Sequence, residues 1–376
     1  MRKIILTTFF KAENYGAALQ VYALQSVLQH KGFCVEILNY RDANIEGAYR
    51  LIKWKQSSFH MFLRACASSI LFYKRNWERH KKFIRFQESY LQIGETEYWN
   101  VRSIKENFPE AECYITGSDQ VWNTEITKEV SDVYTLNFGP EHIQRISYAA
   151  SIGNSQISRE ETRLFREKLS RINVLSVRET TAKITLEKLG LEKSVSVTLD
   201  PVFLRSKEEW ETEIMDIEKI TDKYILAYYV EPDEEYQRVV SELSRRTGLK
   251  VIHFERWRRY SNELFSAYTA GPFEFVNLIR NAEYIITTSF HATAFSIIFH
   301  KEFWAFPHRH TGSRVEDLLS TLKISDRVIH TYEEFLLKRY DQQIDYVKVD
   351  FILDREKDKS LKWLEVALEN RRNMEE

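Results

Sequence analysis

The chain has 376 residues, 43% of them hydrophobic and 29% charged, with 54 basic side chains against 55 acidic ones. This composition is typical of globular proteins and excludes the disordered and fibrous classes. The near-zero charge balance gives no overall field for nucleic acid, so no nucleic-acid partner is expected, and the length predicts two domains of roughly 150 to 200 residues.

Strands and helices alternate through the first half of the sequence. The opening KIILTTFF predicts a strand, NYGAALQVYALQSVLQHKG a helix that Asn14 caps and Gly32 ends, and FCVEILNY a second strand. Further strands are predicted for ECYITGS, RISYAASIG, INVLSVRE and SVSVTLDP, with helices at 158–170 and before Gly190. This order predicts an α/β domain built on a parallel sheet.

The segment from Arg50 to Arg85 interrupts the alternation. It contains ten Lys or Arg residues against the single Glu78, with aromatic residues between them. We expect a basic helical insertion at 50–90, near the mouth of a cleft between the domains. Its composition fits an anionic membrane surface, nucleic acid, or a solvated helical pair with an apolar inner face.

A charged linker at 205–222 precedes a second series of elements. DKYILAYYV, GLKVIHF and EYIITTS predict strands, each followed or preceded by a helical pattern. We therefore expect an N-terminal α/β domain at 1–205, a C-terminal α/β domain at 206–345, and a final helix at 346–376 that packs back on the body. Three scattered cysteines favour a cytoplasmic location, with peripheral attachment at the inner membrane face as an extension of it.

Four polar turns follow predicted strands. They are Asn14-Tyr15-Gly16, Gly117-Ser118-Asp119-Gln120, Ser151-Ile152-Gly153 and Ser289-Phe290-His291. Each turn by itself has a local explanation as a cap or tight turn, and a single His291 among apolar residues is most simply a core histidine. Because ligands of doubly wound sheets bind where strands end and helices begin, the shared position of the turns indicates a small anionic or hydroxylated ligand.

Arginines near the same edge strengthen this interpretation. Arg178 in SVRE and Arg314 in TGSRVEDLL are suited to binding a carboxylate or phosphate, unless they form ordinary surface ion pairs. Arg309, between His308 and His310, lies in a predicted surface loop. The sequence has no dinucleotide fingerprint, P-loop, hydrolase elbow or metal-ligand motif, so we expect neither a cofactor nor a metal.

Seven stretches occur in a distinctive order along the chain. They are NYGAALQVYALQSVL, ITGSDQVWN, SYAASIG, SVRE, LDPVFL, GPFEFVNLIRNAEYIITTSFHATAFSIIF and SRVEDLL. In these stretches the chain resembles the polysaccharide pyruvyl transferase family, over residues 4–325. The resemblance implies two Rossmann-like domains facing a cleft, as in GT-B glycosyltransferases. It also implies phosphoenolpyruvate as donor co-substrate and a hexose acceptor, in a surface polysaccharide or its lipid-linked precursor, that receives pyruvate as a cyclic ketal.

Such a transfer needs groups that bind an anion and groups that move protons. His291 is suited to proton transfer or to holding the phosphate, and Asp119 is the candidate base for a sugar hydroxyl. The residues expected to bind the donor are Arg178, Ser289, Arg314 and Arg309. The acceptor or loop-backbone side is expected to comprise Asn14, Tyr15, Gly16, Ser118, Gln120, Ser151 and Gly153.

The sequence departs from the family pattern at two positions. Ser289 stands where family members tend to have an arginine two residues before the histidine, and Ala292 stands where close relatives often have glycine. The missing charge must then come from Arg314 or Arg309. Two alternatives remain open: a nucleotide-sugar glycosyltransferase, and a non-catalytic carbohydrate-binding subunit of a polysaccharide assembly complex.

Overall fold

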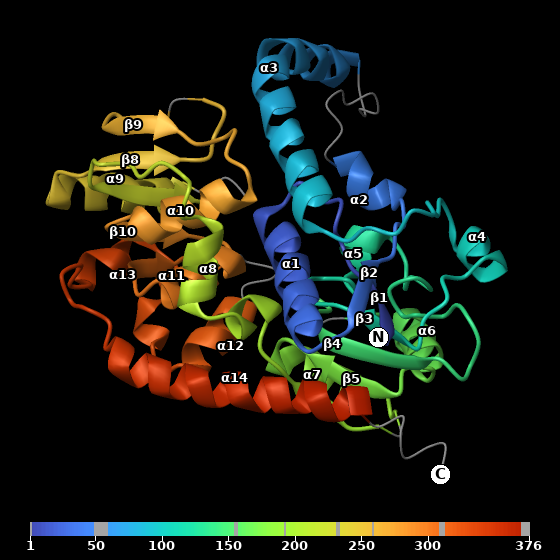
Figure 1. The fold of residues 1–376 in the computed structure, drawn as a ribbon. Helices are drawn as coiled ribbons and strands as arrows, with labels where there is room; N and C mark the ends of the chain where they lie inside the picture. Colours follow the sequence, from blue (N-terminus) through green and yellow to red (C-terminus); the bar gives the residue numbers. More distant parts are fainter. Residues whose placement is uncertain are drawn as a thin grey trace.

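The computed structural model describes residues 2–48, 59–153, 157–191, 193–230, 234–257, 259–307 and 313–369, with the backbone alone at 48 and 59–70. Its strands form two parallel sheets that lie side by side, with helices around and between them (Figure 1). The α/β class and the pair of Rossmann-like domains expected from the sequence are thereby confirmed.

The first sheet has the strand order β2-β1-β3-β4-β5-β6. Its strands are β1 (Lys3–Thr7), β2 (Cys34–Ile37), β3 (Cys113–Thr116), β4 (Gln144–Ala150), β5 (Val174–Val177) and β6 (Val195–Val197). Its helical segments are α1 (Tyr15–His30), α2 (Ala43–Ala48), α3 (Phe59–Tyr90), α4 (Val101–Glu106), α5 (Thr124–Thr127), α6 (Arg159–Leu169), α7 (Thr180–Glu187) and the 3-10 turn η1 (Pro201–Leu204). β3 is buried along its whole length, as expected for a central strand of a parallel sheet that is covered on both faces.

The second sheet has the strand order β11-β10-β7-β8-β9 and is also parallel throughout. Its strands are β7 (Tyr224–Tyr228), β8 (Lys250–His253), β9 (Glu263–Ser266), β10 (Tyr284–Thr287) and β11 (Glu302–Ala305). The remaining helical segments are α8 (Lys207–Glu213), α9 (Glu234–Thr247), α10 (Pro272–Asn281), α11 (Phe290–Ile298), α12 (Ser313–Thr321), η2 (Ser325–Arg327), α13 (Tyr332–Leu337) and α14 (Tyr346–Glu369).

The segment at 205–222 is more than the charged linker that its composition suggests. Ser206 and Glu209 form a capping box that starts α8, in which each side chain bonds the other residue's backbone N–H. The Trp210 side chain is fully buried, and its ring packs edge-on against Phe295 of α11. Trp210, together with the ion pair of Glu211 and Arg280, therefore holds this charged helix against the body.

Helix α3 connects the two halves of the molecule, rising between the sheets in Figure 1. Arg79 of α3 donates to the Glu13 carbonyl of one half at 2.8 Å and to the Tyr268 carbonyl of the other at 3.2 Å. Lys82 pairs with Glu274 at the start of α10. Several basic side chains of the predicted insertion thus make contacts within the protein. In the described part of the chain, no helix combines the length and apolarity needed to cross a membrane.

Helix α14 runs along both halves in Figure 1. Near its start, the Asp350 carboxylate lies 3.0 Å from the His300 ring of the second half. Near its end, the Ala367 carbonyl accepts from Gln144 of β4 at 2.6 Å. The chain passes from the first sheet to the second between β6 and β7, and the boundaries proposed at 205–206 and 345–346 remain predictions.

Candidate active site

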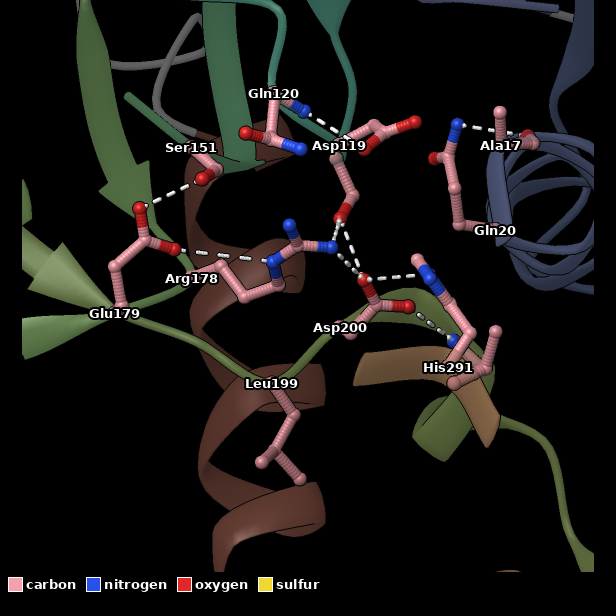
Figure 2. Close-up of polar contacts among 12 residues, drawn as sticks. Ala17, Gln20, Asp119, Gln120, Ser151, Arg178, Glu179, Leu199, Asp200 and His291 are labelled. Atoms are coloured by element: carbon pink, nitrogen blue, oxygen red, sulfur yellow. Dashed lines mark hydrogen bonds and ion pairs between the residues drawn. The ribbon is translucent and has the colours of Figure 1, made fainter. Parts of the chain in front are cut away.

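Polar side chains gather where the strands of the first sheet end and face the start of α11 from the second half (Figure 2). Asp119 follows β3, Ser151 follows β4, and Arg178 with Glu179 follows β5. Asp200 follows β6 and caps η1, accepting from the Val202 N–H at 3.1 Å. His291 is the second residue of α11. The order of strands in the sheet therefore brings residues from distant parts of the chain to one edge.

The carboxylate of Asp200 connects the polar residues of both halves. Its Oδ2 accepts from the Ser118 hydroxyl at 2.8 Å and from Nη1 of Arg178 at 2.7 Å. The Nε2 atom of His291 lies 3.4 Å from the same oxygen. The Asp200 side chain is completely buried. One buried carboxylate thus fixes the orientation of an arginine from one half and a histidine from the other.

The surroundings of Asp200 hold it in the ionised form. Burial raises the pKa of this carboxyl group, but the charges and hydrogen bonds of His291 and Arg178 lower it more strongly. The net result is a pKa well below the ordinary aspartate value. Asp200 consequently remains a hydrogen-bond acceptor at neutral pH.

The guanidinium of Arg178 is buried and only partly used by the protein. Its side chain is 1% exposed, and Phe290 covers it, with the ring centroid 4.5 Å from Cζ. Nη1 is bonded to Asp200, whereas Nε and Nη2 are buried and have no hydrogen-bond partner among the described residues. Burial lowers the pKa of Arg178, but Asp200, Glu179 and Asp119 raise it above its ordinary value. Arg178 is therefore a permanent cation whose Nε–H and two Nη2–H bonds make no hydrogen bond within the described part of the protein.

Glu179 is a second buried carboxyl group next to Arg178. Its Oε1 accepts from the Ser151 hydroxyl at 2.7 Å, while Oε2 lies 3.8 Å from Nε of Arg178, too far for a hydrogen bond. Burial raises the pKa of Glu179 above its ordinary value, and the charges of Arg178 and Arg314 offset this only in part. Glu179 therefore makes no hydrogen bond with the Nε–H of Arg178, although the two charged groups are adjacent.

The ring of His291 rests on the first turn of α1. A Cβ atom placed on Gly16 would lie 2.0 Å from Nδ1 of His291, so a side chain at position 16 cannot coexist with the observed ring position. Since Nε2 faces Asp200, Nδ1 is the ring nitrogen on the Gly16 side. Glycine at position 16 is required here for close approach.

Asp119 has a backbone conformation that is unusual for a residue with a side chain. Its φ angle is +80°, in the left-handed region, and its Oδ1 accepts from the Gln120 N–H at 2.8 Å. Its carbonyl accepts from the Ser151 N–H at 2.9 Å, which ties the ends of β3 and β4 together. Backbone strain of this kind costs of order 1–3 kcal/mol and is concentrated at functional sites.

Arg314 lies at the start of α12 and is half-buried. Burial, and then repulsion by Arg178, lower its pKa to about 10, so it stays charged at neutral pH. Asp317 of the same helix accepts from the Thr180 N–H at the start of α7 at 3.0 Å. This bond joins α12 to the arginine-bearing edge of the first sheet.

Other predicted residues have local structural contacts. Asn14 and Ser289 cap α1 and α11. The Oε1 atom of Gln120 accepts from Asn123, and Gly153 adopts a positive φ of 75° beside that pair. The Tyr15 side chain points into the aromatic core, where its ring stacks on Phe275 at 4.4 Å. Arg309 lies outside the described residues.

Sequence reasoning did not single out Asp200, Glu179 or Phe290. Asp200 lies in the stretch LDPVFL, Glu179 in SVRE and Phe290 in SFH. The resemblance therefore included these positions without indicating their roles. An aspartate before proline is first interpreted as a turn residue. A glutamate beside an arginine is first interpreted as a surface ion pair. Their burial, which the local sequence does not indicate, is what makes the two carboxyl groups part of the site.

Two of the solved structures that are similar to this chain come from S. aureus and Neisseria meningitidis. MnaA from S. aureus, solved with UDP, has a TM-score of 0.50 and 12% identity, covering 89% of this chain and 86% of that chain. The UDP-GlcNAc 2-epimerase of Neisseria meningitidis has a TM-score of 0.48 and 10% identity, covering 98% of this chain and 99% of that chain. At this identity, the MnaA match shows the fold alone, which is the GT-B architecture.

The sequence itself was compared with protein families and with curated proteins. No curated protein matches the chain. The model of the family described as polysaccharide pyruvyl transferase matches residues 14–310, which include the residues placed at the ends of β3, β4, β5 and β6 and at the start of α11. The chain belongs to the polysaccharide pyruvyl transferase family.

Proposed function

We propose that this protein transfers pyruvate from phosphoenolpyruvate to two hydroxyl groups of a hexose in a surface polysaccharide or its lipid-linked precursor. The proposal rests on the buried Arg178, which adjoins the pair of His291 and Asp200. In the part of the chain that the structure describes, its Nε and Nη2 atoms have no hydrogen-bond partner. A buried cation with unused donors fits an anionic substrate. A histidine beside it fits the proton transfers that the reaction requires.

The overall reaction balances without an oxidant or a cofactor. The C3 carbon of phosphoenolpyruvate gains a proton, C2 forms bonds to two sugar oxygens, and the bond from C2 to the phosphate oxygen breaks. The two sugar hydroxyls release two protons. One is equivalent to the proton gained at C3, and the other leaves with hydrogen phosphate.

Each residue of the site has a proposed part in this reaction. Arg178 binds the donor carboxylate or phosphate through Nε and Nη2, while Asp200 holds Nη1 in place. His291 is the proposed proton-transfer group, and Asp200 orients its ring through Nε2. Asp119 accepts a proton from a sugar hydroxyl. Arg314 supplies positive charge near His291. In a family member with arginine at the position of Ser289, that arginine would supply this charge.

The test is incubation of the protein with phosphoenolpyruvate and simple or lipid-linked galactosides, followed by mass spectrometry. We expect a product heavier by one ketal-linked pyruvate. Parallel incubations with a panel of nucleotide sugars examine the glycosyltransferase alternative, since a product heavier by one hexose would replace our proposal. Absence of any product, with saccharide binding retained, would instead support a non-catalytic carbohydrate-binding subunit.

Two variants separate donor binding from proton transfer. Arg178→Lys should weaken phosphoenolpyruvate binding about ten- to a hundredfold in calorimetry, because an ammonium cannot reproduce the planar set of donors. His291→Gln should retain much of that binding but lose about 10² to 10⁴ in turnover. If turnover of the His291 variant falls only in proportion to its thermal stability, the residue is structural.

A further inference from the structure

A cleft of about 500 Å³ lies on the N-terminal half, away from the cluster around Asp200. Its walls come from α2 and Arg41 before it, the C-terminal part of α3, the loop between β1 and α1, and the segment between α3 and α4. Residues that line it include Lys11, Glu13, Arg41, Glu46, His80 and Trp99. Its volume lies within the usual range for small-molecule sites, roughly 300 to 1,000 Å³.

Trp99 gives this cleft an aromatic surface. The residue is 63% exposed, which is unusual for tryptophan in a protein that buries most of its large aromatic residues. The Arg41 guanidinium lies 4.6 Å from the ring centroid and covers one part of the indole. An oriented, solvent-exposed indole can bind the C–H face of a pyranose ring through its negative π face.

The polar groups of the cleft are balanced in charge. Arg41 is bonded to Glu46 through two contacts of 2.7 Å, and His80 Nδ1 lies 2.5 Å from Glu13. Lys11 lies 4.0 Å from Glu97. Since these three basic side chains each lie beside a carboxylate, the cleft provides no excess positive charge for an anion. It offers hydrogen-bond donors and acceptors together, which is what neutral hydroxyl groups need.

The cleft is joined to the reaction centre through one short loop. Lys11 and Glu13 line the cleft, and the same loop continues into Asn14 and Gly16, against which the His291 ring rests. We propose that the cleft around Trp99 binds neutral sugar units of the acceptor chain, next to the unit that is modified. The identification of these sugar units as part of the acceptor rests on the proposed function. Binding of a saccharide in the cleft does not itself require phosphoenolpyruvate.

The binding test uses an array of neutral and acidic oligosaccharides of bacterial surface type, without phosphoenolpyruvate. The wild-type protein should bind neutral oligosaccharides, and Trp99→Ala should weaken this binding about tenfold or more, since tryptophan is a typical dominant contact. Trp99→Phe should retain most of it. Trp257→Ala is the matched control, because Trp257 is 59% exposed but lies after β8 in the other half.

Several outcomes would overturn this assignment. They are no binding of neutral oligosaccharides by the wild type, stronger binding of acidic ones, or equal losses for Trp99→Ala and Trp257→Ala. Turnover with a monosaccharide acceptor should be the same in Trp99→Ala and wild type, whereas KM for an oligosaccharide should rise. If binding depends on Trp99 but no variant uses phosphoenolpyruvate, the saccharide site stands and the proposed transfer fails.

Discussion

At the scale of single residues, Asp200 connects polar side chains from both halves of the molecule. It holds Ser118, Arg178 and His291 through one oxygen atom. Removal of one partner from a buried ion pair typically costs about 3–5 kcal/mol, because the other charge is left uncompensated. We therefore expect Asp200→Asn to lower both activity and stability.

The pH dependence distinguishes this charge effect from simple loss of packing. The folded-state pKa of Asp200 is depressed, so its stabilisation is present above the unfolded-state value of about 3.9 and is lost as the pH falls below it. The difference in Tm between wild type and Asp200→Asn should be large at pH 7 and shrink below about pH 4. A difference that is constant from pH 7 to pH 3 would contradict this account.

Gly16 provides a second test at this scale. In Gly16→Ala the new methyl group would lie 2.0 Å from Nδ1 of His291, so the ring must leave its observed position beside Asp200. We expect a large loss of turnover at saturating substrate. Gly47→Ala is the control, because a Cβ there meets no atom within 4 Å, and it should leave activity unchanged. Equal activity of the two variants would show that the position of His291 is unimportant.

At the scale of elements, α3 is one of the connections between the two halves. Arg79 donates to the Tyr15 hydroxyl at 2.6 Å as well as to the Glu13 and Tyr268 carbonyls. Hydrogen bonds from a charged donor contribute about 1.5–3 kcal/mol each, so Arg79→Ala should reduce the unfolding free energy by about 3 kcal/mol or more. Lys82→Ala should cost no more than about 1 kcal/mol, because the pair of Lys82 with Glu274 is more than one-third exposed. Chemical denaturation measures both.

The proposal that the protein associates with a membrane rests on the outer face of α3. Tyr73 and Trp77 are exposed and stack on each other, Lys81 lies 5.3 Å from the Trp77 ring, and Lys74 is exposed. Aromatic and basic side chains together suit an anionic bilayer surface, where each basic residue contributes about 1 kcal/mol. Tyr73→Ala with Trp77→Ala should reduce flotation with phosphatidylglycerol vesicles, whereas Phe351→Ala should not. Failure of the wild type to float at low salt would contradict the proposal.

At the scale of the whole molecule, the two halves share one core. The largest hydrophobic cluster includes Leu6 and Ile146 of the first sheet with Leu226 and Ile285 of the second. Leu364 of α14 belongs to this cluster and is fully buried, whereas Val366 is 48% exposed. Leu364→Ala should cost about 2–5 kcal/mol and Val366→Ala about 0.5 kcal/mol or less.

The shared core also predicts how the molecule unfolds. Fluorescence and circular dichroism should follow one transition with a common midpoint, because neither sheet can lose its helices without exposing the cluster of the other. Two resolved transitions, or equal effects of Leu364→Ala and Val366→Ala, would show that the halves are independent.

The sequence by itself determined the class of the fold, because the periodicity of apolar residues distinguishes strands from helices locally. The alternation of strand and helix patterns then indicates βαβ units. It also placed Arg178, Asp119 and His291 at strand ends, since an end is marked by the change from apolar to polar residues. It did not indicate β9 or β11. β9 is a short edge strand with the sequence ELFS and no fully buried position, and so it lacks a strong pattern.

The tertiary structure alone decided what surrounds each of these residues. Asp200 and Glu179 belong to the site because both carboxyl groups are buried, which changes their pKa, and because they contact partners from other elements. His291 is such a partner of Asp200, and Ser151 of Glu179. Tyr15 became an interdomain contact because Phe275, far along the chain, stacks on it. Burial, pKa and pairing depend on residues that are remote in sequence, so local patterns could locate the site but not assign the contacts within it.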